Sequence, residues 1–240
     1  MKLINFASKF INMKILILVA MDKELNLLVE EMPQHKVIEK GNIQYLLGRI
    51  KDKEVAVAKC GIGKVNSALN TLRLIREVKP DLVINTGVAG GVDGELKIAS
   101  VLIPDKIAYH DVWCGPGTEY GAADGFGQYL LPDKNLIDKA RESFKGNQEV
   151  KFGLICSGDK FIHLADEVRA IKEKFPESKA VDMESASIAQ TCESEGVPFA
   201  VIRVMSDTPG AAENISQYNN FWGTAPKKTF GCLVELIGCL

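Results

Sequence analysis

The chain has 240 residues, of which 46% are hydrophobic and 25% are charged, so it can bury a sizeable core and is expected to be neither disordered nor fibrous. Its 29 Lys and Arg residues nearly balance 31 Asp and Glu residues, which leaves a net charge of −2 at pH 7. This balance lacks the basic surplus that nucleic-acid binding requires, so a nucleic-acid partner is not expected.

The cysteines and histidines do not have the spacing of a disulfide scaffold or a metal site. The six cysteines contain no CxxC pair, and the three histidines form no tight cluster with them. This usage is typical of reduced thiols and favours a cytoplasmic location. No metal is expected.

The N-terminal residues 1–12 precede a short apolar run. The run from Ile15 to Met21 is only seven residues long, lysines flank it, and no small-residue cleavage site follows. It is too short for a membrane span and lacks the features of a signal peptide. We therefore expect an N-terminal extension over residues 1–12, no membrane association, and Met13 as a candidate start of translation.

Hydrophobic patterning predicts that strands and helices alternate along the chain. The predicted strands cover residues 15–20, 43–47, 55–58, 81–85, 101–103, 152–156 and 198–204, and residues 36–59 have the pattern of an antiparallel meander. The predicted helices cover residues 22–32, 64–78, 136–144, 165–175, 184–195 and 227–240. Alternation of this kind predicts a layered α/β fold, and no repeat or linker divides residues 13–240 into two domains.

Two glycine-rich segments are predicted to be loops. Residues 86–91 (TGVAGG) follow a buried strand, and glycines there let the backbone approach a ligand closely. Residues 115–127 carry five glycines and no periodicity, which indicates a long surface loop. The first of these loops is a predicted ligand site.

Three carboxylates follow the ends of predicted strands, where ligands gather in open α/β sheets. Glu24, Glu184 and Asp207 come from distant parts of the chain and can converge in one pocket, which suits acid–base chemistry on a sugar. Each also has an ordinary explanation. Glu24 and Glu184 lie in first turns of predicted helices, where an acid is favourable, and Asp207 can cap a turn.

Seven short blocks stand in order along the chain. They are AMxxE at 20–24, GIGKV at 61–65, INTGxAGG at 84–91, YHD at 109–111, SGDxFI at 157–162, ME at 183–184 and RxxSD at 203–207. Together they resemble the 5′-methylthioadenosine/S-adenosylhomocysteine nucleosidases of the nucleoside phosphorylase-like group. The resemblance extends from about Met13 to the C-terminus and implies a single nucleosidase domain over residues 13–240.

The resemblance implies a three-layer α/β/α fold around a central mixed sheet, nucleoside phosphorylase-like, and a homodimer. It implies a small-molecule substrate and hydrolysis of the N-glycosidic bond of 5′-thio-substituted adenine nucleosides, without a cofactor. By position, Glu24 resembles the residue that handles the attacking water and Asp207 the acid that serves the adenine, while Arg203 helps to hold the water. The implied substrate-binding residues are Glu184 and Met183 at the ribose hydroxyls, Phe161 and Ile162 at the base, Met21 and Ile62 in the nonpolar wall, and Val88 and Ser206 beside them.

Water is the expected nucleophile, because phosphate recognition favours clustered Arg and Lys. Asn85 stands where related phosphorylases have an Arg before the glycine segment, and residues 21–24 are acidic. Val88 stands where the family commonly has a Ser, and residues 111–127 depart from the family's usual loop, so the preferred 5′ substituent stays open. The alternatives are a related purine nucleoside hydrolase or phosphorylase with a different nucleoside, and a non-catalytic nucleoside-binding protein.

Overall fold

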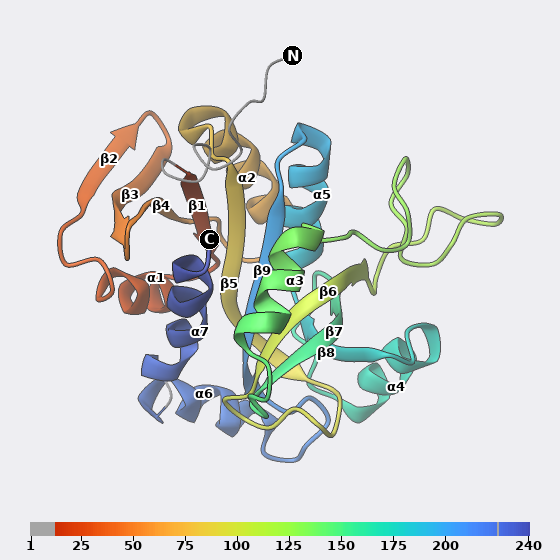
Figure 1. Cartoon of the computed structure of the whole chain (residues 1–240). Helices are drawn as coiled ribbons and strands as arrows, with labels where there is room; N and C mark the ends of the chain where they lie inside the picture. The colour runs from red at the N-terminus through yellow and green to blue at the C-terminus, as the bar shows by residue number, and fades with distance from the viewer. Residues whose placement is uncertain (1–12, 225) are drawn as a thin grey trace.

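A computed structural model describes residues 13–224 and 226–240, and the predicted extension over residues 1–12 lies outside the described residues. Within the described residues, a nine-stranded sheet forms the centre of the protein and helices cover its two faces (Figure 1). The strand order is β2-β3-β4-β1-β5-β8-β7-β6-β9, and β9 also pairs with β5. The predicted α/β/α layering around a mixed sheet is confirmed.

Strands and helices alternate through most of the chain, as predicted. The strands are β1 (Lys14–Val19), β2 (Lys36–Lys40), β3 (Ile43–Ile50), β4 (Lys53–Lys59), β5 (Leu82–Gly91), β6 (Val101–Tyr109), β7 (Val150–Ser157), β8 (Ser178–Asp182) and β9 (Phe199–Asp207). The helices are α1 (Asp22–Val29), α2 (Lys64–Val78), α3 (Lys134–Ser143), α4 (Ala165–Lys174), α5 (Ser185–Glu195), α6 (Asn214–Thr224) and α7 (Pro226–Gly238).

The two faces of β1 separate the core into two layers, because successive side chains of a strand point to opposite faces. Ile15 and Ile17 pack with residues of α3 and α7, whereas Leu16 and Leu18 pack with residues of α2 and α5. All four side chains are completely buried. The continuous apolar run at 15–20 therefore reflects a central strand that is covered on both faces.

The sheet has two parts, an antiparallel meander and a closed set of strands with both parallel and antiparallel pairs. The strands β2, β3 and β4 form the predicted antiparallel meander, and β4 then pairs in parallel with β1. The remaining strands β5, β8, β7, β6 and β9 close into a ring, because β9 returns to pair in parallel with β5. The carboxyl ends of β1, β5 and β9 consequently lie at the same edge of the sheet.

The prediction of a loop over residues 86–91 is wrong. These residues form the second half of β5. Residues 86–90 pair in parallel with β9, with one irregularity between Ala89 and Gly90, and residues 90–91 pair in antiparallel direction with β8. The glycines do not reverse the chain. They let side chains of other segments approach the backbone of β5 closely. A Cβ on Gly87 would lie 2.4 Å from Oε1 of Glu24, and a Cβ on Gly90 would lie 2.5 Å from Cγ of Pro209.

Several predicted boundaries also differ from the structure. Helix α6 was not predicted, because residues 208–220 are rich in Pro, Gly and Asn, which favour turns. Helix α1 ends at Val29 rather than at residue 32, and β6 and β7 are longer than predicted. Helix α3 begins at Lys134, since the side chain of Asp133 accepts a hydrogen bond from the backbone N–H of Leu136 and caps the helix.

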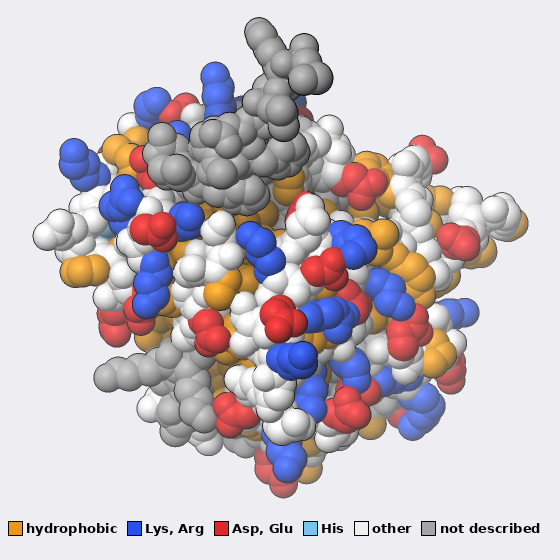
Figure 2. Space-filling model, in the orientation of Figure 1, with side chains coloured by type: hydrophobic (Ala, Val, Ile, Leu, Met, Phe, Trp, Pro, Cys, Tyr) orange, Lys and Arg blue, Asp and Glu red, His pale blue; other side chains and the backbone are white. Residues whose placement is uncertain are grey.

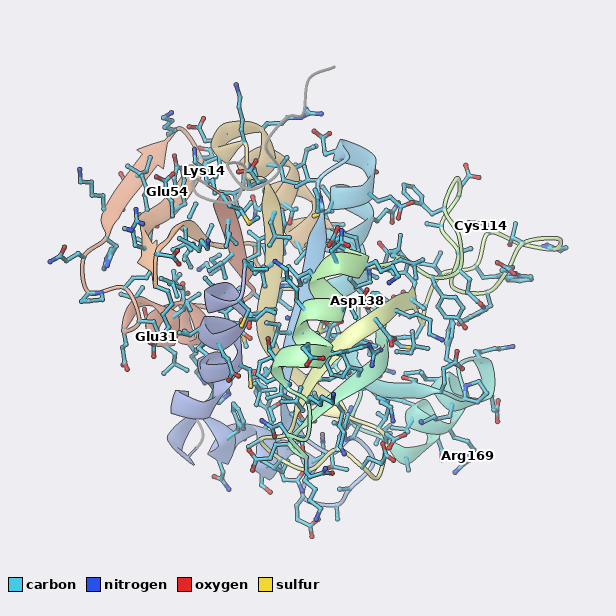
Figure 3. The ribbon with its side chains drawn as sticks, in the orientation of Figure 1. Lys14, Glu31, Glu54, Cys114, Asp138 and Arg169 are labelled. Carbon is cyan, nitrogen blue, oxygen red and sulfur yellow. The ribbon has the colours of Figure 1, made fainter. Side chains whose placement is uncertain are left out.

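The predicted loop at 115–127 is confirmed, since these residues contain no helix or strand. The loop projects from the body of the molecule in Figure 1, and Cys114, labelled in Figure 3, directly precedes it. An ion pair of 2.8 Å between Lys64 Nζ and Asp111 Oδ2 joins the segment before this loop to α2.

Acidic and basic side chains are intermixed on the face seen in Figure 2, in keeping with the small net charge. Over residues 13–224 and 226–240, no helix has both the length and the apolar character needed to cross a membrane. In the same ranges, no cluster of three or more His, Cys, Asp or Glu residues has the arrangement of a metal site.

Candidate active site

A cavity of about 260 Å³ lies at the shared edge of β1, β5 and β9. The loop after β7, the end of β8 and helix α6 complete its wall. The lining residues are Ala20, Met21, Glu24, Ile62, Val88, Ala89, Gly90, Lys160, Phe161, Ile162, Val181, Asp182, Met183, Glu184, Ser206, Asp207 and Tyr218. The structure thus brings the three carboxylates of the sequence analysis to one cavity.

Glu24 is held in the cavity wall by backbone amides. Its Oε2 accepts hydrogen bonds from the N–H groups of Ala20 at 2.8 Å and Met21 at 3.0 Å, and its Oε1 accepts one from Val88 at 3.0 Å. The side chain is 2% exposed, and this burial raises its pKa above the ordinary 4.5. The nearby charge of Arg203 and the three amides act in the opposite direction. Glu24 is therefore a carboxylate of fixed orientation that accepts a proton more readily than an exposed Glu does.

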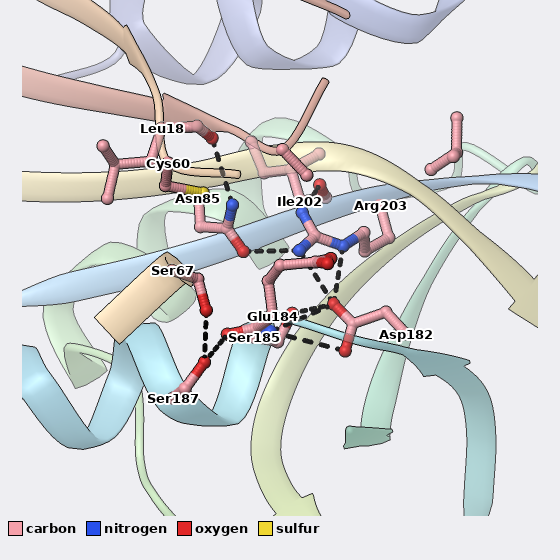
Figure 4. A network of polar contacts seen from close by, with 12 residues as sticks. Leu18, Cys60, Ser67, Asn85, Asp182, Glu184, Ser185, Ser187, Ile202 and Arg203 are labelled. Atoms are coloured by element: carbon pink, nitrogen blue, oxygen red, sulfur yellow. Dashed lines mark hydrogen bonds and ion pairs between the residues drawn. The ribbon is translucent and has the colours of Figure 1, made fainter. Parts of the chain in front are cut away.

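Arg203 is not among the residues that line the cavity, but it contacts one of them, Asp182, in the polar network of Figure 4. Its Nε and Nη2 donate to Oδ2 of Asp182 at 2.9 and 2.8 Å, Nη2 also donates to Oδ1 of Asn85, and Nη1 donates to the Ile202 carbonyl at 3.4 Å. All its donor nitrogens are engaged by the protein. Arg203 is not among the lining residues, and its charge acts on the carboxylates around it, so a role in holding the attacking water stays a prediction.

The buried charges around Arg203 support one another. Burial opposes the charge of Arg203, but Asp182, Glu184 and Glu24 more than offset this effect and raise its pKa. Asn85 orients the guanidinium from the other side, because its Nδ2 donates to the Leu18 carbonyl at 3.0 Å and leaves Oδ1 facing Arg203. One cation is thus shared among three acids at the base of the cavity.

The ion pair of Arg203 with Asp182 is expected to be essential for stability. Both side chains are 2% exposed, so Asp182→Ala leaves a buried guanidinium without its partner and should lower the free energy of unfolding by about 3–5 kcal/mol. Asp166→Ala is the matched control, because the pair of Asp166 with Arg169 is exposed and should contribute at most about 1 kcal/mol. Urea denaturation measures both. Equal, small losses in the two variants would contradict this expectation.

Glu184 stands at the start of α5 and reaches across the cavity to the segment before α2. Its Oε1 accepts a hydrogen bond of 2.9 Å from the backbone N–H of Gly63. Gly63 has a φ of +86°, which strains residues with a side chain, and a Cβ there would lie 2.9 Å from Asp159 Oδ1. Burial and the charge of Asp182 raise the pKa of Glu184 to about 8, against the effects of Gly63 and Arg203.

The raised pKa of Glu184 is expected to make the ligand-free protein less stable as the pH rises. Its pKa is about 8 in the folded protein against an ordinary 4.5, so the folded state binds this proton more tightly than the unfolded state does. The stability gained is complete below the ordinary value and is lost as the pH rises through the folded value. Glu184→Gln cannot ionise and should flatten this part of the curve of Tm against pH. Parallel curves for the two proteins would rule this explanation out.

Asp207 ends β9 and is 2% exposed. Its Oδ1 accepts a hydrogen bond of 2.6 Å from Ser206 Oγ, and its Oδ2 accepts one from Nδ2 of Asn214 on α6. Burial raises the pKa of Asp207, and these two donors limit the increase. A carboxyl group in this environment holds its proton at a higher pH than an exposed Asp does, as a general acid requires.

Two aromatic residues, Phe161 and Tyr218, form part of the cavity wall. Phe161 is 42% exposed, and its ring meets the edge of the Tyr218 ring at a centroid distance of 5.4 Å. The Tyr218 hydroxyl lies 3.6 Å from Sδ of Met21, which connects α6 to the segment after β1. A flat, apolar ligand can lie against the accessible ring of Phe161.

The structure places ten of the eleven predicted site residues in the cavity wall, Arg203 being the exception. The ten are Met21, Glu24, Ile62, Val88, Phe161, Ile162, Met183, Glu184, Ser206 and Asp207. Sequence reasoning missed the roles of Asp182, Asn214 and Tyr218. Asp182 was visible as an acid at a strand end, whereas Asn214 and Tyr218 lie on α6, which no hydrophobic pattern had predicted.

Comparisons with known proteins agree with this fold. Residues 14–238 match the family model described as the phosphorylase superfamily. The chain is 39% identical over 231 residues to the 5′-methylthioadenosine/S-adenosylhomocysteine nucleosidase of Lysinibacillus sphaericus, covering 95% of this chain and all of the relative.

Two solved structures are similar over nearly their whole length. The nucleosidase of the same name from Neisseria meningitidis, in complex with methylthio-immucillin-A, has a TM-score of 0.88 and 36% identity, with 95% of this chain and 99% of that chain covered. The nucleosidase from Streptococcus pneumoniae, in complex with 8-aminoadenine, has a TM-score of 0.89 and 36% identity, with 95% and 100% covered.

Proposed function

The chain belongs to the 5′-methylthioadenosine/S-adenosylhomocysteine nucleosidases of the phosphorylase superfamily, and from this premise we propose how its cavity carries out the reaction of that family. The chain is an N-glycosidic hydrolase that releases adenine from 5′-methylthioadenosine and S-adenosylhomocysteine. The observation that best supports this function is the convergence of Glu24, Glu184 and Asp207 on one buried cavity.

The charges of the cavity suit cleavage of an N-glycosidic bond. In the transition state the ribose gains positive charge and the departing adenine gains negative charge, so anions are needed beside the sugar and a proton donor beside the base. Glu24 supplies negative charge beside the sugar, to which Glu184 adds in its ionised form, and Asp207 supplies the proton. Phe161 offers a ring for the purine to stack on, and the Met183 backbone and Glu184 meet the ribose hydroxyls.

We assign the proton transfers as follows. The C1′–N9 bond breaks with its electron pair going to adenine, and Asp207 gives its proton to a ring nitrogen of the purine. Glu24 takes a proton from the water that bonds to C1′. Val88 offers no hydroxyl to this water, so Glu24 is the polar side chain that orients it, and the charge of Arg203 favours the ionised form of Glu24 against the effect of burial.

The cavity wall contains little that would bind phosphate. Among the described residues that line it, Lys160 is the one with a cationic side chain, and its Nζ is already paired with Glu167. Phosphate sites favour clustered Arg and Lys. Water is therefore the nucleophile that this cavity favours.

We also propose that the catalytic domain comprises residues 13–240 and works as a cytoplasmic homodimer. The exposed apolar side chains of Val65 and Leu69 lie on α2, and that of Ile62 lies just before this helix and also lines the cavity. Exposed apolar patches mark association surfaces. The cysteines of the described residues are free thiols, in keeping with a reducing compartment. Sedimentation equilibrium tests the dimer, and a monomer at micromolar concentration would contradict it.

The direct test is to incubate the purified protein with 5′-methylthioadenosine, S-adenosylhomocysteine, adenosine and inosine, and to measure the free base with and without phosphate. We expect adenine from the two thio-substituted nucleosides at rates that phosphate does not change. Release that depends on phosphate would identify a phosphorylase. Tight binding without free adenine would identify a nucleoside-binding protein.

A further inference from the structure

A buried amide joins the proposed acid to helix α6. Asn214 is the first residue of this helix and is 2% exposed, and its Nδ2 donates to Oδ2 of Asp207. The other carboxyl oxygen, Oδ1, accepts from Ser206 Oγ. Each oxygen of Asp207 therefore has its own donor, and the two donors differ. A hydroxyl can reverse its hydrogen bond and accept, whereas an amide N–H can only donate.

The other end of the Asn214 side chain has no obvious structural purpose. Its Oδ1 is buried and has no hydrogen-bond partner among the residues that the structure describes. A buried acceptor without a partner is unfavourable, so packing and local hydrogen bonding do not explain an Asn at this position. The contact that remains to explain it is the one with Asp207.

Helix α6 is fixed relative to Asp207 by a second contact. The side chain of Gln217 accepts a hydrogen bond of 2.8 Å from the backbone N–H of Thr208, the residue that follows Asp207. One helical turn after Asn214, Tyr218 enters the cavity wall. Helix α6 is thus hydrogen-bonded both to Asp207 and to the residue that follows it, and these two contacts fix the Asn214 amide relative to the acid.

We propose that Asn214 is a positioning residue for the adenine-protonating step: its amide N–H reserves Oδ2 of Asp207 as an acceptor and so directs the catalytic proton to Oδ1. The proposal rests on the proposed function, in which Asp207 gives this proton to the purine as the C1′–N9 bond breaks. Asp207 is then left as a carboxylate that accepts from both Asn214 and Ser206. The bond from Asn214 strengthens as this negative charge forms, which favours proton release.

Asn214→Leu is the first test, because Leu has nearly the same size and no donor. Without the donor Asp207 is a weaker acid, so kcat should fall about 10- to 100-fold, a part of the about 10² to 10⁴ that a general acid supplies, with little change in KM. For the same reason the basic limb of the profile of kcat/KM against pH should move to higher pH. Ser216→Ala, on an exposed position of the same helix, is the control and should leave both quantities unchanged.

Asn214→Asp is a second, nearly isosteric variant that tests the same point if the Leu variant folds poorly. Two facing carboxyl groups hold a shared proton to higher pH, so the basic limb should move further than in Asn214→Leu. The other titratable side chains of the cavity, Glu24, Asp182, Glu184, Lys160 and Tyr218, are the same in all variants. Their titration therefore cannot produce a graded shift.

The outcomes separate this inference from the proposed function. If the unaltered protein releases no adenine, the proposed function fails. If it releases adenine but both Asn214 variants keep its rate, or lose rate by the same factor at every pH, Asn214 has only a structural role and the inference is overturned.

Discussion

Asp207→Asn is expected to lower kcat for adenine release by about 10² to 10⁴, the range that a general acid typically supplies. The Asn side chain has nearly the same shape and keeps hydrogen-bonding groups for Ser206 and Asn214, so the fold should be preserved. It has no acidic proton to give to the purine. Steady-state release of adenine from 5′-methylthioadenosine at neutral pH measures this loss, and thermal unfolding checks that the variant is folded.

The matched control for Asp207→Asn is Asp138→Asn on the exposed side of α3 (Figure 3). It makes the same chemical change far from the cavity wall and should leave kcat unchanged. A folded Asp207→Asn variant with near-normal turnover would remove Asp207 from the role of acid. A leaving group that is already a weak base needs less protonation. Asp207→Asn should therefore slow the release of a purine with electron-withdrawing substituents less than it slows the release of adenine.

The layers of the fold could be predicted because strands buried on both faces have an unambiguous pattern. The run at 15–20 has no polar residue, and only a central strand of a layered sheet explains it. The glycine segment of β5 was misinterpreted, since glycine usually breaks a strand. At Gly87 and Gly90 it is needed because Glu24 and Pro209 approach the backbone too closely for any side chain.

The carboxylates of the site could be predicted for a similar reason. Glu24, Glu184 and Asp207 each follow the end of a strand, and the fold class is enough to bring strand ends together. The contacts of Arg203 could not be predicted, because they depend on whether Asp182 turns inward at the end of β8. The α6 residues were missed because their helix forms through packing on β9 and α7 rather than through its own sequence preference.

Glu24→Gln is expected to abolish most of the hydrolysis while leaving binding of the nucleoside intact. The amide cannot take a proton from water, so kcat should fall about 10² to 10⁴. The loss of negative charge beside the ribose removes part of the stabilisation of a cationic transition state and adds to this effect. Because these two contributions belong to the transition state, kcat and kcat/KM should fall together, and KM should change little.

The Gln side chain also tests how Glu24 is held. Glu24 accepts three backbone hydrogen bonds on two oxygens, and a Gln amide offers only one oxygen, so at least one N–H of Ala20, Met21 or Val88 loses its acceptor. Glu24→Gln should therefore also cost about 1–3 kcal/mol of unfolding free energy, whereas Glu31→Gln, at an exposed position just after α1 (Figure 3), should cost little.

Isothermal titration of the Glu24→Gln variant with 5′-methylthioadenosine measures the binding that remains. If Glu24→Gln binds the nucleoside and still releases adenine at a near-normal rate, the water is activated by another group. Glu184, a second buried Glu in the cavity wall, would then be the first candidate for the group that activates the water.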